Sequence, residues 1–465
     1  MSQTAPSSKH APPLTESYSL PSEFLTRSDE LRLDAAKYNP QLINAMRALR
    51  ESGMRLVRLA DITEKVFMLK RFKRDYVGPE HGLPYIQGSH IPCFQIMGLK
   101  YLSRAYKHID QLMIKAGWLL ISCSGTVGRV TMCPAEWDGW VATHDMVRII
   151  PDEEKCPGGY LYAFLASPMG QSQLVSQVYG AVVDHLTEEH IGNVLVPLPD
   201  TPEDEDLVRL VNAAMKESVA RRSEAVSLVN KAIEGTPKLS QDAPHVNWFS
   251  LRTDRMSEDL RMDAGSYNPA FLHALDQLSG MDTAPLREVA EVFMPTRFKR
   301  IYVDPEHGIP FLQGIHVTHF QAANLKYLFR EHKHIDEVTV KAGSLLITRS
   351  GTVGRVTMCP SEWDGWAATE DIIRVIPKEK KCPGGYLYSF LASPMGQIQL
   401  TSQVYGAVVD HLTEEHVKNV LVPLPTARTA KKIDSIVREG IGAKSQAVAL
   451  AEEGVKKLID RFEKH

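Results

Sequence analysis

Two short clusters of basic residues have the composition of phosphate-binding loops. Each places cations on both sides of one phenylalanine, Phe72 in the first and Phe298 in the second. Guanidinium and ammonium groups neutralise phosphate, and the ring can anchor the loop that carries them. The alternative is an ordinary solvated turn. The candidate contacts are Lys70, Arg71, Lys73 and Arg74, then Arg297, Lys299 and Arg300.

A Gln-Gly-x-His motif follows each basic cluster, at Gln87–His90 and at Gln313–His316. A glutamine amide can bind adenine through two hydrogen bonds in the major groove, and the glycine lets the backbone approach a ligand closely. We therefore expect Gln87, His90, Gln313 and His316 to contact nucleic acid.

A third motif, SGTVGR, occurs at Ser124–Arg129 and at Ser350–Arg355. Two glycines around a hydroxyl residue make a tight loop whose N–H groups could face an anion, although a structural β-turn has the same composition. Arg349 precedes the second loop where Cys123 precedes the first, and arginine binds guanine well. The candidate contacts here are Ser124, Thr126, Arg129, Arg349, Ser350, Thr352 and Arg355.

Signatures of catalysis are missing from the sequence. It has no GxxxxGK[ST] phosphate loop, no FxGxG-type loop for S-adenosylmethionine and no nucleophile with a matching base. His185 and His190 stand five residues apart, so on a helix they would point in different directions and suit a zinc site poorly. We expect a binding protein with no catalytic residue, no metal and no cofactor of its own.

All these motifs occur twice because the chain contains an internal repeat, two copies of one sequence unit in tandem. Val66–Pro199 and Val292–Pro425 align without a gap, with about seven positions in ten identical. The differences gather at Ser89–Gly98 against Ile315–Asn324 and at Ser122-Cys123 against Thr348-Arg349, and His144 stands against Glu370. We interpret these differences as positions where the two copies contact different bases, with drift at the surface or in the core as the alternative.

In each copy, the sequence pattern changes once along the chain, from one typical of short strands and helices to one typical of a long helix. Runs such as Trp118–Ser122 and Met146–Ile150 predict strands between turns, and Tyr160–Tyr179 predicts a helix interrupted near Pro168. After these, Glu203–Glu234 predicts a long helix. Its apolar stripe comprises Leu207, Val211, Met215, Ala225, Val229 and Ala232, with Ser218 and Arg222 as weak points. The stripe of the second copy comprises Ile433, Val437, Ile441, Val448, Ala451, Val455, Leu458 and Phe462.

Neither long helix could bury its stripe alone, so we expect the two to pack on each other as a coiled coil. The fold class is α+β, with two tandem β-rich domains, each followed by a long helix. The expected boundaries are a disordered tail at 1–20, recognition domains at 21–200 and 249–425, spacer helices at 201–236 and 426–465, and a linker at 237–248.

The ordered motifs resemble those of specificity (S) subunits of type I restriction–modification systems. The order is RLDAxxYNP, LLISCSGTVGRV, GGYLYxFLxSPxGQxQL and HLTEEHIxNVLVPLP followed by a long helix, and it occurs twice. The resemblance implies that the two β-rich domains are target-recognition domains and that the two spacer helices form an antiparallel coiled coil. It also implies a non-catalytic subunit that binds double-stranded DNA and docks DNA methyltransferase subunits, which bind S-adenosylmethionine themselves. A restriction or translocase subunit is a further possible partner. Since the copies are nearly alike, we expect a bipartite, nearly palindromic site.

Composition restricts which other classes of protein this chain could belong to. Hydrophobic residues make up 43% of the chain and charged residues 23%, with a net charge of −3. No apolar run reaches the ~20 residues of a membrane helix, and we expect a cytoplasmic protein without a membrane partner. Two alternatives stay open: a stand-alone duplicated DNA-binding or assembly module of a phage-defence locus without restriction activity, and an enzyme with an unrecognised site.

Overall fold

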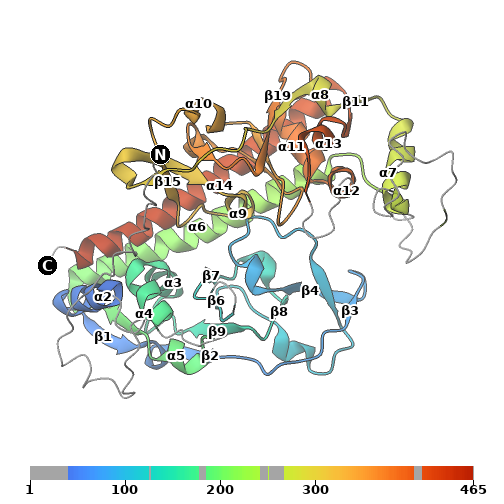
Figure 1. Ribbon diagram of the computed structural model, residues 1–465. Helices are drawn as coiled ribbons and strands as arrows, with labels where there is room; N and C mark the ends of the chain where they lie inside the picture. The colour runs from blue at the N-terminus through green and yellow to red at the C-terminus, as the bar shows by residue number, and fades with distance from the viewer. Residues whose placement is uncertain are drawn as a thin grey trace, which may run out of the picture.

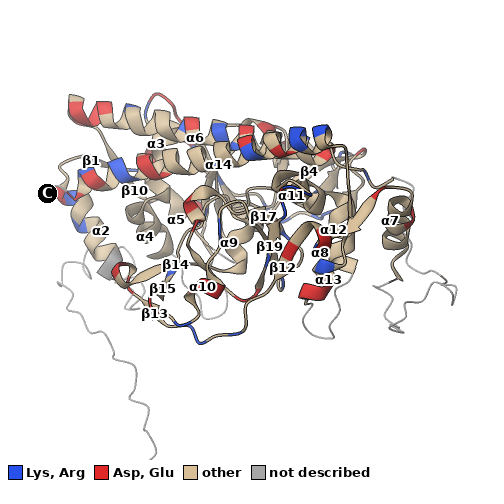
Figure 2. Ribbon diagram, turned by 90° about the horizontal axis from the view of Figure 1, so that it is seen from above, with Lys and Arg blue, Asp and Glu red and all other residues tan. Residues whose placement is uncertain are grey.

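The computed structural model describes residues 40–124, 127–176, 185–240, 250, 267–402 and 411–463. Two long helices, α6 (Pro202–Glu234) and α14 (Ala427–Phe462), run side by side through the molecule, and the two copies lie against them (Figure 1). Seen from above, both copies lie on the same side of this helix pair (Figure 2). The expected tail at 1–20 and most of the expected linker lie outside the described residues.

The first copy contains three small sheets. One has the order β2-β9-β6-β7, one the order β3-β5-β4-β8, and β1 pairs with β10; every pairing is antiparallel except β4 with β8. The strands are β1 (Arg55–Arg58), β2 (Thr63–Phe67), β3 (Tyr76–Val77), β4 (Gly82–Ile86), β5 (Lys100–Ser103), β6 (Leu119–Ser122), β7 (Val130–Met132), β8 (Val141–Ala142), β9 (Met146–Pro151) and β10 (Leu195–Leu198). The helices are α2 (Pro40–Glu51), α3 (Gly158–Ala166), α4 (Pro168–Ser176) and α5 (Glu188–Gly192).

The second copy repeats this topology strand for strand. Its sheets have the orders β12-β19-β16-β17, β13-β15-β14-β18 and β11-β20. The strands are β11 (Thr283–Pro285), β12 (Ala290–Phe293), β13 (Tyr302–Val303), β14 (Gly308–Leu312), β15 (Lys326–Phe329), β16 (Leu345–Thr348), β17 (Val356–Met358), β18 (Ala367–Ala368), β19 (Ile372–Pro377) and β20 (Leu421–Pro423). The helices are α7 (Pro269–Ser279), α8 (Leu286–Val289), α9 (Gly314–Thr318), α10 (Ile335–Val338), α11 (Gly384–Ala392), α12 (Pro394–Ser402) and α13 (Glu414–Lys418).

The strands and helices predicted from the sequence are present, with small shifts at their ends. The predicted helix Tyr160–Tyr179 is two helices, α3 and α4, because Pro168 begins a new helix and Ser167 is left in an extended conformation between them. Gly170 lets α4 approach α3, since a Cβ there would lie 2.2 Å from the Phe164 carbonyl oxygen. The α+β fold with two β-rich regions and paired long helices is confirmed.

The long helices pair antiparallel. Near the start of α6, Asp204 accepts a hydrogen bond from Arg461 Nε near the end of α14 at 2.8 Å. Further along, the Ser218 hydroxyl donates to the Ala447 carbonyl oxygen at 2.6 Å. Ser218 thus lies on the buried face between the helices, although it interrupts the apolar stripe.

Small residues bring the two helices close together. A Cβ at Gly440 would lie 3.0 Å from a methyl group of Val229, and one at Gly454 would lie 3.1 Å from the sulfur of Met215. Val448, Ala451 and Val455 of the expected stripe are only partly buried. The buried positions in that part of α14 are Ala443, Lys444, Ala447 and Gly454, so the seam follows small residues rather than the large apolar ones.

The helix pair shares its apolar surface with both copies. The core of the first copy includes Met215 of α6 together with Leu458 and Phe462 of α14. The core of the second copy includes Val229 of α6 and Ile433 of α14. Each copy is therefore anchored near the opposite end of the same antiparallel pair.

The two copies also contact each other directly, through equivalent residues. Cys93 of the first copy and His319 of the second, which align in the repeat, form an isolated antiparallel bridge. Beside them, Phe94 N donates to Thr318 O at 2.9 Å and the equivalent Phe320 N donates to Pro92 O at 2.7 Å. Contacts that exchange under the repeat define a pseudo-two-fold axis at Cys93 and His319.

The helices brace this axis with two buried cations. Arg222 of α6 donates to Cys93 O at 2.7 Å, and Lys444 of α14 donates to His319 O at 3.3 Å. Each cation also lies over aromatic rings: Arg222 over Trp137 and Phe320, Lys444 over Phe94 and Trp363. Arg222 interrupts the apolar stripe of α6 because it reaches across to hold the contact between the copies.

The divergent segments Ser89–Gly98 and Ile315–Asn324 contain this contact. Some differences between the copies therefore lie where the copies pack against each other, although the equivalent Phe94 and Phe320 beside the axis are identical. That other positions of these segments contact bases stays a prediction. None of the described helices is long and apolar enough to span a bilayer.

Burial of Lys444 makes the stability of the protein depend on pH. Burial lowers the pKa of Lys444 to about 8. Between pH 8 and the unfolded value near 10.5 the unfolded chain binds more protons, so stability rises with pH in this window. Relative to Lys444→Met, we expect the wild type to gain of the order of 2 kcal/mol between pH 7 and about pH 9.5, measured by urea unfolding. Lys456→Met on the exposed face of α14 is the matched control, and an equal pH dependence in Lys444→Met and the wild type would contradict the account.

Candidate nucleic-acid interface

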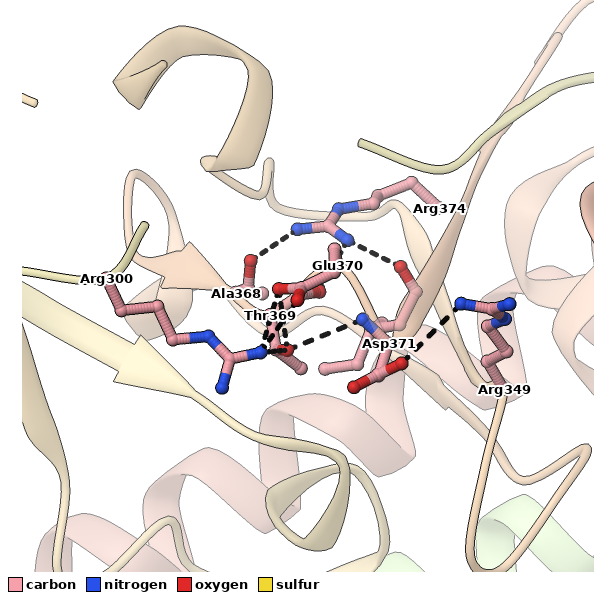
Figure 3. Close-up of polar contacts among 8 residues, drawn as sticks. Arg300, Arg349, Ala368, Thr369, Glu370, Asp371 and Arg374 are labelled. Carbon is pink, nitrogen blue, oxygen red and sulfur yellow. Dashed lines mark hydrogen bonds and ion pairs between the residues drawn. The ribbon is translucent and has the colours of Figure 1, made fainter. Parts of the chain in front are cut away.

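The second copy holds a polar cavity of about 670 Å³ beside its basic loop. We call it the reader pocket of copy two. Arg297, Arg300, Arg349, Glu370 and Asp371 line it, so it gathers three of the cations expected from the sequence. Figure 3 shows how the side chains of Arg300 and Arg349 approach the Thr369–Asp371 turn from opposite sides.

Arg300 and Glu370 form the strongest ion pair of this pocket. Arg300 Nη2 lies 2.9 Å from each carboxylate oxygen of Glu370 and 3.0 Å from the Thr369 hydroxyl (Figure 3). Burial, the largest single effect, raises the pKa of Glu370, but the hydrogen bond and charge of Arg300, with hydrogen bonds from the Glu370 backbone and Thr369, together outweigh it and the pKa is lowered. Glu370 is therefore a charged, fixed acceptor at neutral pH.

Arg349 faces the same turn from the other side. One of its guanidinium nitrogens lies 3.7 Å from Asp371, a loose ion pair, and its Nε has no acceptor among the described residues. Its Nε is buried, but the side chain is 28% exposed, and the exposed part of the guanidinium can bind a guanine edge or a phosphate. This geometry suits the role expected for Arg349.

A cavity of about 400 Å³ lies beside the basic loop of copy one, and we call it the reader pocket of copy one. Arg74, Gln87, Ser124, Arg129 and Asp145 line it. Only Arg74 and Asp145 have equivalents in the lining of the copy-two pocket, Arg300 and Asp371. Arg74 of the basic loop lies 3.6 Å from the Asp145 carboxylate and forms an ion pair with it. The equivalent Asp371 is paired instead with Arg349, outside the basic loop.

The difference between the pockets comes from two exchanges. Copy one has Cys123 and His144 where copy two has Arg349 and Glu370. Cys123 is buried, and burial raises its pKa to about 12, so it carries no charge. Burial also lowers the pKa of His144. At these two positions, copy two thus carries one cation and one anion that copy one lacks.

A buried arginine under each pocket was not expected from the sequence. Arg374 donates to the carbonyl oxygens of Ala368 at 2.7 Å and Thr369 at 2.8 Å (Figure 3), and Arg148 makes the equivalent bonds in copy one. Burial lowers the pKa of Arg374 to about 9. These arginines fix the turn that carries the pocket carboxylates. The signal in the sequence is a single arginine inside an apolar strand, MVRII and IIRVI.

The basic loops lie at the surface and are anchored as expected. Phe72 contacts Tyr106 and His144, and Phe298 contacts Phe311 and His332. Figure 2 shows the loop between β12 and β13 on the side of the molecule opposite α6 and α14. The cations at its outer side are exposed: Lys70, Arg71 and Lys73 in copy one, Arg297 and Lys299 in copy two.

Four N–H groups of the SGTVGR loops, those of Gly128, Arg129, Gly354 and Arg355, bind within the loops, which corrects part of the expected anion nest. Gly128 N donates to Ser122 O, and Arg129 N to the Ser122 hydroxyl; Gly354 and Arg355 make the same bonds to Thr348. These N–H groups therefore cannot bind an anion. Ser350 is half-buried and Thr352 exposed, whereas Thr126 lies outside the described residues.

The Gln-Gly-x-His motifs also serve the fold in part. The imidazole Nδ1 of His90 accepts from Gln87 N at 3.2 Å, and that of His316 accepts from Gln313 N at 3.1 Å. His316 is 4% exposed, so its expected contact with DNA is corrected to a structural role. Gln87 lines the reader pocket of copy one, whereas Gln313 faces a cavity shared between the copies.

One exposed tyrosine in each copy, on the edge strand β3 or β13, was also not predicted from the sequence. Tyr76 and Tyr302 are 42% and 40% exposed, and the ammonium groups of Lys100 and Lys326 each lie 4.9 Å from their ring centres. Both lie on the short edge strands that follow the basic loops, so they extend the cationic surface outward.

Comparison with known proteins places this site in a family. Residues 279–439 match the family model of the type I restriction modification DNA specificity domain. This segment is therefore similar to that domain family. It contains the reader pocket of copy two, and the resemblance to S subunits seen in the sequence is confirmed. The first copy shares the repeat with the second.

Solved S-subunit structures are similar over most of the chain. The crystal structure of a type I restriction-modification S subunit from M. genitalium is 13% identical, covering 87% of this chain and 96% of its own, with a TM-score of 0.38. That of the HsdS subunit from Thermoanaerobacter tengcongensis is 17% identical, covering 88% and 96%, with a TM-score of 0.28. No curated protein sequence matches the chain significantly.

The exposed cations of the basic loop should bind phosphate without regard to sequence. For Arg297→Gln with Lys299→Gln, we expect the affinity for specific and non-specific duplexes to fall by the same factor. The slope of log K against log salt should become shallower by about 2, since each phosphate contact contributes about 0.9. A salt titration by fluorescence anisotropy measures this, with Lys380→Gln and Lys381→Gln as the charge-matched control. An unchanged slope would exclude the loop from the interface.

Proposed function

We propose that this chain is the DNA-recognition subunit of a type I restriction–modification complex, which reads two similar half-sites and directs a partner methyltransferase to them. The observation that carries the proposal is the pseudo-two-fold relation between two nearly identical copies on one antiparallel helix pair. The family match of residues 279–439 supports DNA recognition as the activity.

The symmetry of the protein predicts the symmetry of the site. Two copies related by a two-fold axis present equivalent surfaces in opposite directions, and duplex DNA presents its half-sites in the same relation when they are inverted. The target is therefore a pair of inverted half-sites with a gap between them. The helices of 33 and 36 residues are each about 50 Å long at 1.5 Å per residue. This exceeds one turn of duplex, so both copies can face the same side of the DNA.

Within each half-site, the pocket and the basic loop have different roles. Arg74 and Gln87 in copy one, and Arg300 and Arg349 in copy two, line the pockets and are proposed to contact base edges. The exposed cations of the basic loops are proposed to contact phosphates. Arg148 and Arg374 position the pocket carboxylates and do not touch DNA.

A partner supplies the chemistry and part of the affinity. The net charge of −3 is too low for tight binding by charge alone, so the methyltransferase subunits are proposed to complete the clamp around the duplex. They bind S-adenosylmethionine and transfer the methyl group. A restriction or translocase subunit joins the same assembly. The solved structure of complex assembly in a type I R-M system, 17% identical to this chain, comes from the same class of protein.

Co-expression tests the proposal directly. The chain, expressed with the methyltransferase subunits encoded beside it, should co-purify with them and generate methylation at one interrupted motif, mapped by long-read sequencing. Methyltransferase subunits expressed alone should leave that motif unmethylated. A stable chain that binds DNA but recruits no methyltransferase would instead favour a stand-alone binding module.

Exchange of two pocket residues should make the target symmetric. Arg349→Cys with Glu370→His converts the charged positions of copy two into those of copy one. We expect the base pairs that differ between the half-sites to become alike in the methylation motif, while the gap keeps its length. Loss of all methylation by a folded complex would contradict the assignment, and so would an unchanged motif. Glu331→Ala, another difference between the copies outside the pockets, is the control.

A further inference from the structure

A cavity of about 340 Å³ lies between the two copies at the pseudo-two-fold axis. Arg129 of the first copy and the equivalent Arg355 of the second both line it, together with His90, Thr352 and His319. Among the described residues that line it there is no aspartate or glutamate. Two equivalent guanidinium groups therefore converge on one space, from opposite copies.

Both arginines lack an acidic partner among the described residues. The side chain of Arg129 has one polar neighbour, Nε2 of His319 at 3.5 Å, and Arg355 forms no ion pair there. Burial lowers the pKa of both guanidinium groups, and it lowers the pKa of His319 to about 4, so that imidazole is neutral at physiological pH. Partly buried cations held without a counter-ion are expected where an anion is to be bound.

The central cavity adjoins the reader pocket of copy one. Arg129 and Ser89 line both spaces. On the helix side, Arg222 and Lys444 bind the carbonyl oxygens of Cys93 and His319. DNA bound in the reader pocket of copy one would therefore lie next to the central arginines.

The geometry of DNA identifies what lies over the axis. When two half-sites are read in the major groove from one side, about one helical turn apart, the minor groove faces the protein midway between them. This groove is only ~6 Å wide, and its negative potential, strongest in A·T-rich sequence, attracts arginine side chains. The two-fold axis of such a site passes through that groove.

We infer that Arg129 and Arg355 bind the minor groove of the spacer between the two half-sites, one arginine from each side of the axis, and so make recognition sensitive to spacer shape. The inference rests on the proposed function. It adds a third DNA contact at a segment where no base need be specified, because a narrow groove is favoured whatever its exact sequence.

Binding to DNA with different spacers tests the inference. The wild-type complex with its methyltransferase subunits is titrated with duplexes that share both half-sites and the spacer length but carry an A·T-rich or a G·C-rich spacer. We expect about fivefold tighter binding to the A·T-rich duplex. In Arg129→Gln with Arg355→Gln this preference should disappear, and in Arg355→Gln alone, at a residue outside both reader pockets, it should weaken while the methylation motif keeps both half-sites. Each single variant should keep an intermediate preference.

The control removes two charges from equivalent exposed positions elsewhere. Lys155→Gln with Lys381→Gln should lower affinity slightly for both duplexes and keep the spacer preference. A wild-type complex that binds both duplexes equally overturns the inference, as does a double variant that still prefers the A·T-rich spacer. A wild-type complex that binds without needing either half-site overturns the proposed function itself.

Discussion

The antiparallel pairing of α6 and α14 is the constraint on which the rest of the molecule depends. Neither helix can leave its apolar face in water, and the close approach at Gly440 and Gly454 leaves little freedom in their register. The Ser218–Ala447 hydrogen bond and the Asp204–Arg461 ion pair connect the same two helices at different positions along their length. Because each copy shares a core with one end of this pair, the pairing sets the pseudo-two-fold relation between the copies.

Divergence between the copies has two physical origins. At the axis, equivalent residues meet, and Cys93 faces His319 there. In the reader pocket of copy two, all the lining residues belong to the second copy. There the exchange of Cys123 for arginine accompanies that of His144 for glutamate, so the pocket charge stays balanced while the pattern of donors and acceptors changes. The first kind of difference preserves the fold, and the second is available for specificity.

Much of the fold was predictable from the sequence, because it depends on local pattern and on the repeat. The strands at Leu119–Ser122 and Met146–Pro151 and the helix α6 follow from periodicity and turn residues. The break between α3 and α4 follows from Pro168. The contact between the copies was not predictable, since the bridge between Cys93 and His319 is set by the helix register and leaves no local signal. The roles of the buried polar residues Ser218, Arg222 and Lys444 were not predictable for the same reason. Each is a polar residue on an apolar helix face, and its hydrogen-bond partner lies in a distant segment of the chain.

The candidate site was predicted in part. Basic loops and cations were found because phosphate and base contacts need particular residue types, and Arg74, Arg300 and Arg349 do gather at the pockets. His316 and the N–H groups of the SGTVGR loops were misassigned because the same residue types also satisfy turns. The buried Arg148 and Arg374 were missed since a supporting residue has no motif of its own.

The central claim is that one half-site reader is used twice about a two-fold axis. Hydroxyl-radical footprinting of the complex on both strands of its methylation site tests this most directly. The account predicts protection that is symmetric about the centre of the spacer, with two equivalent outer patches and a central patch on the minor groove facing the protein. Protection with the same polarity in both half-sites, as for a direct repeat, would contradict it.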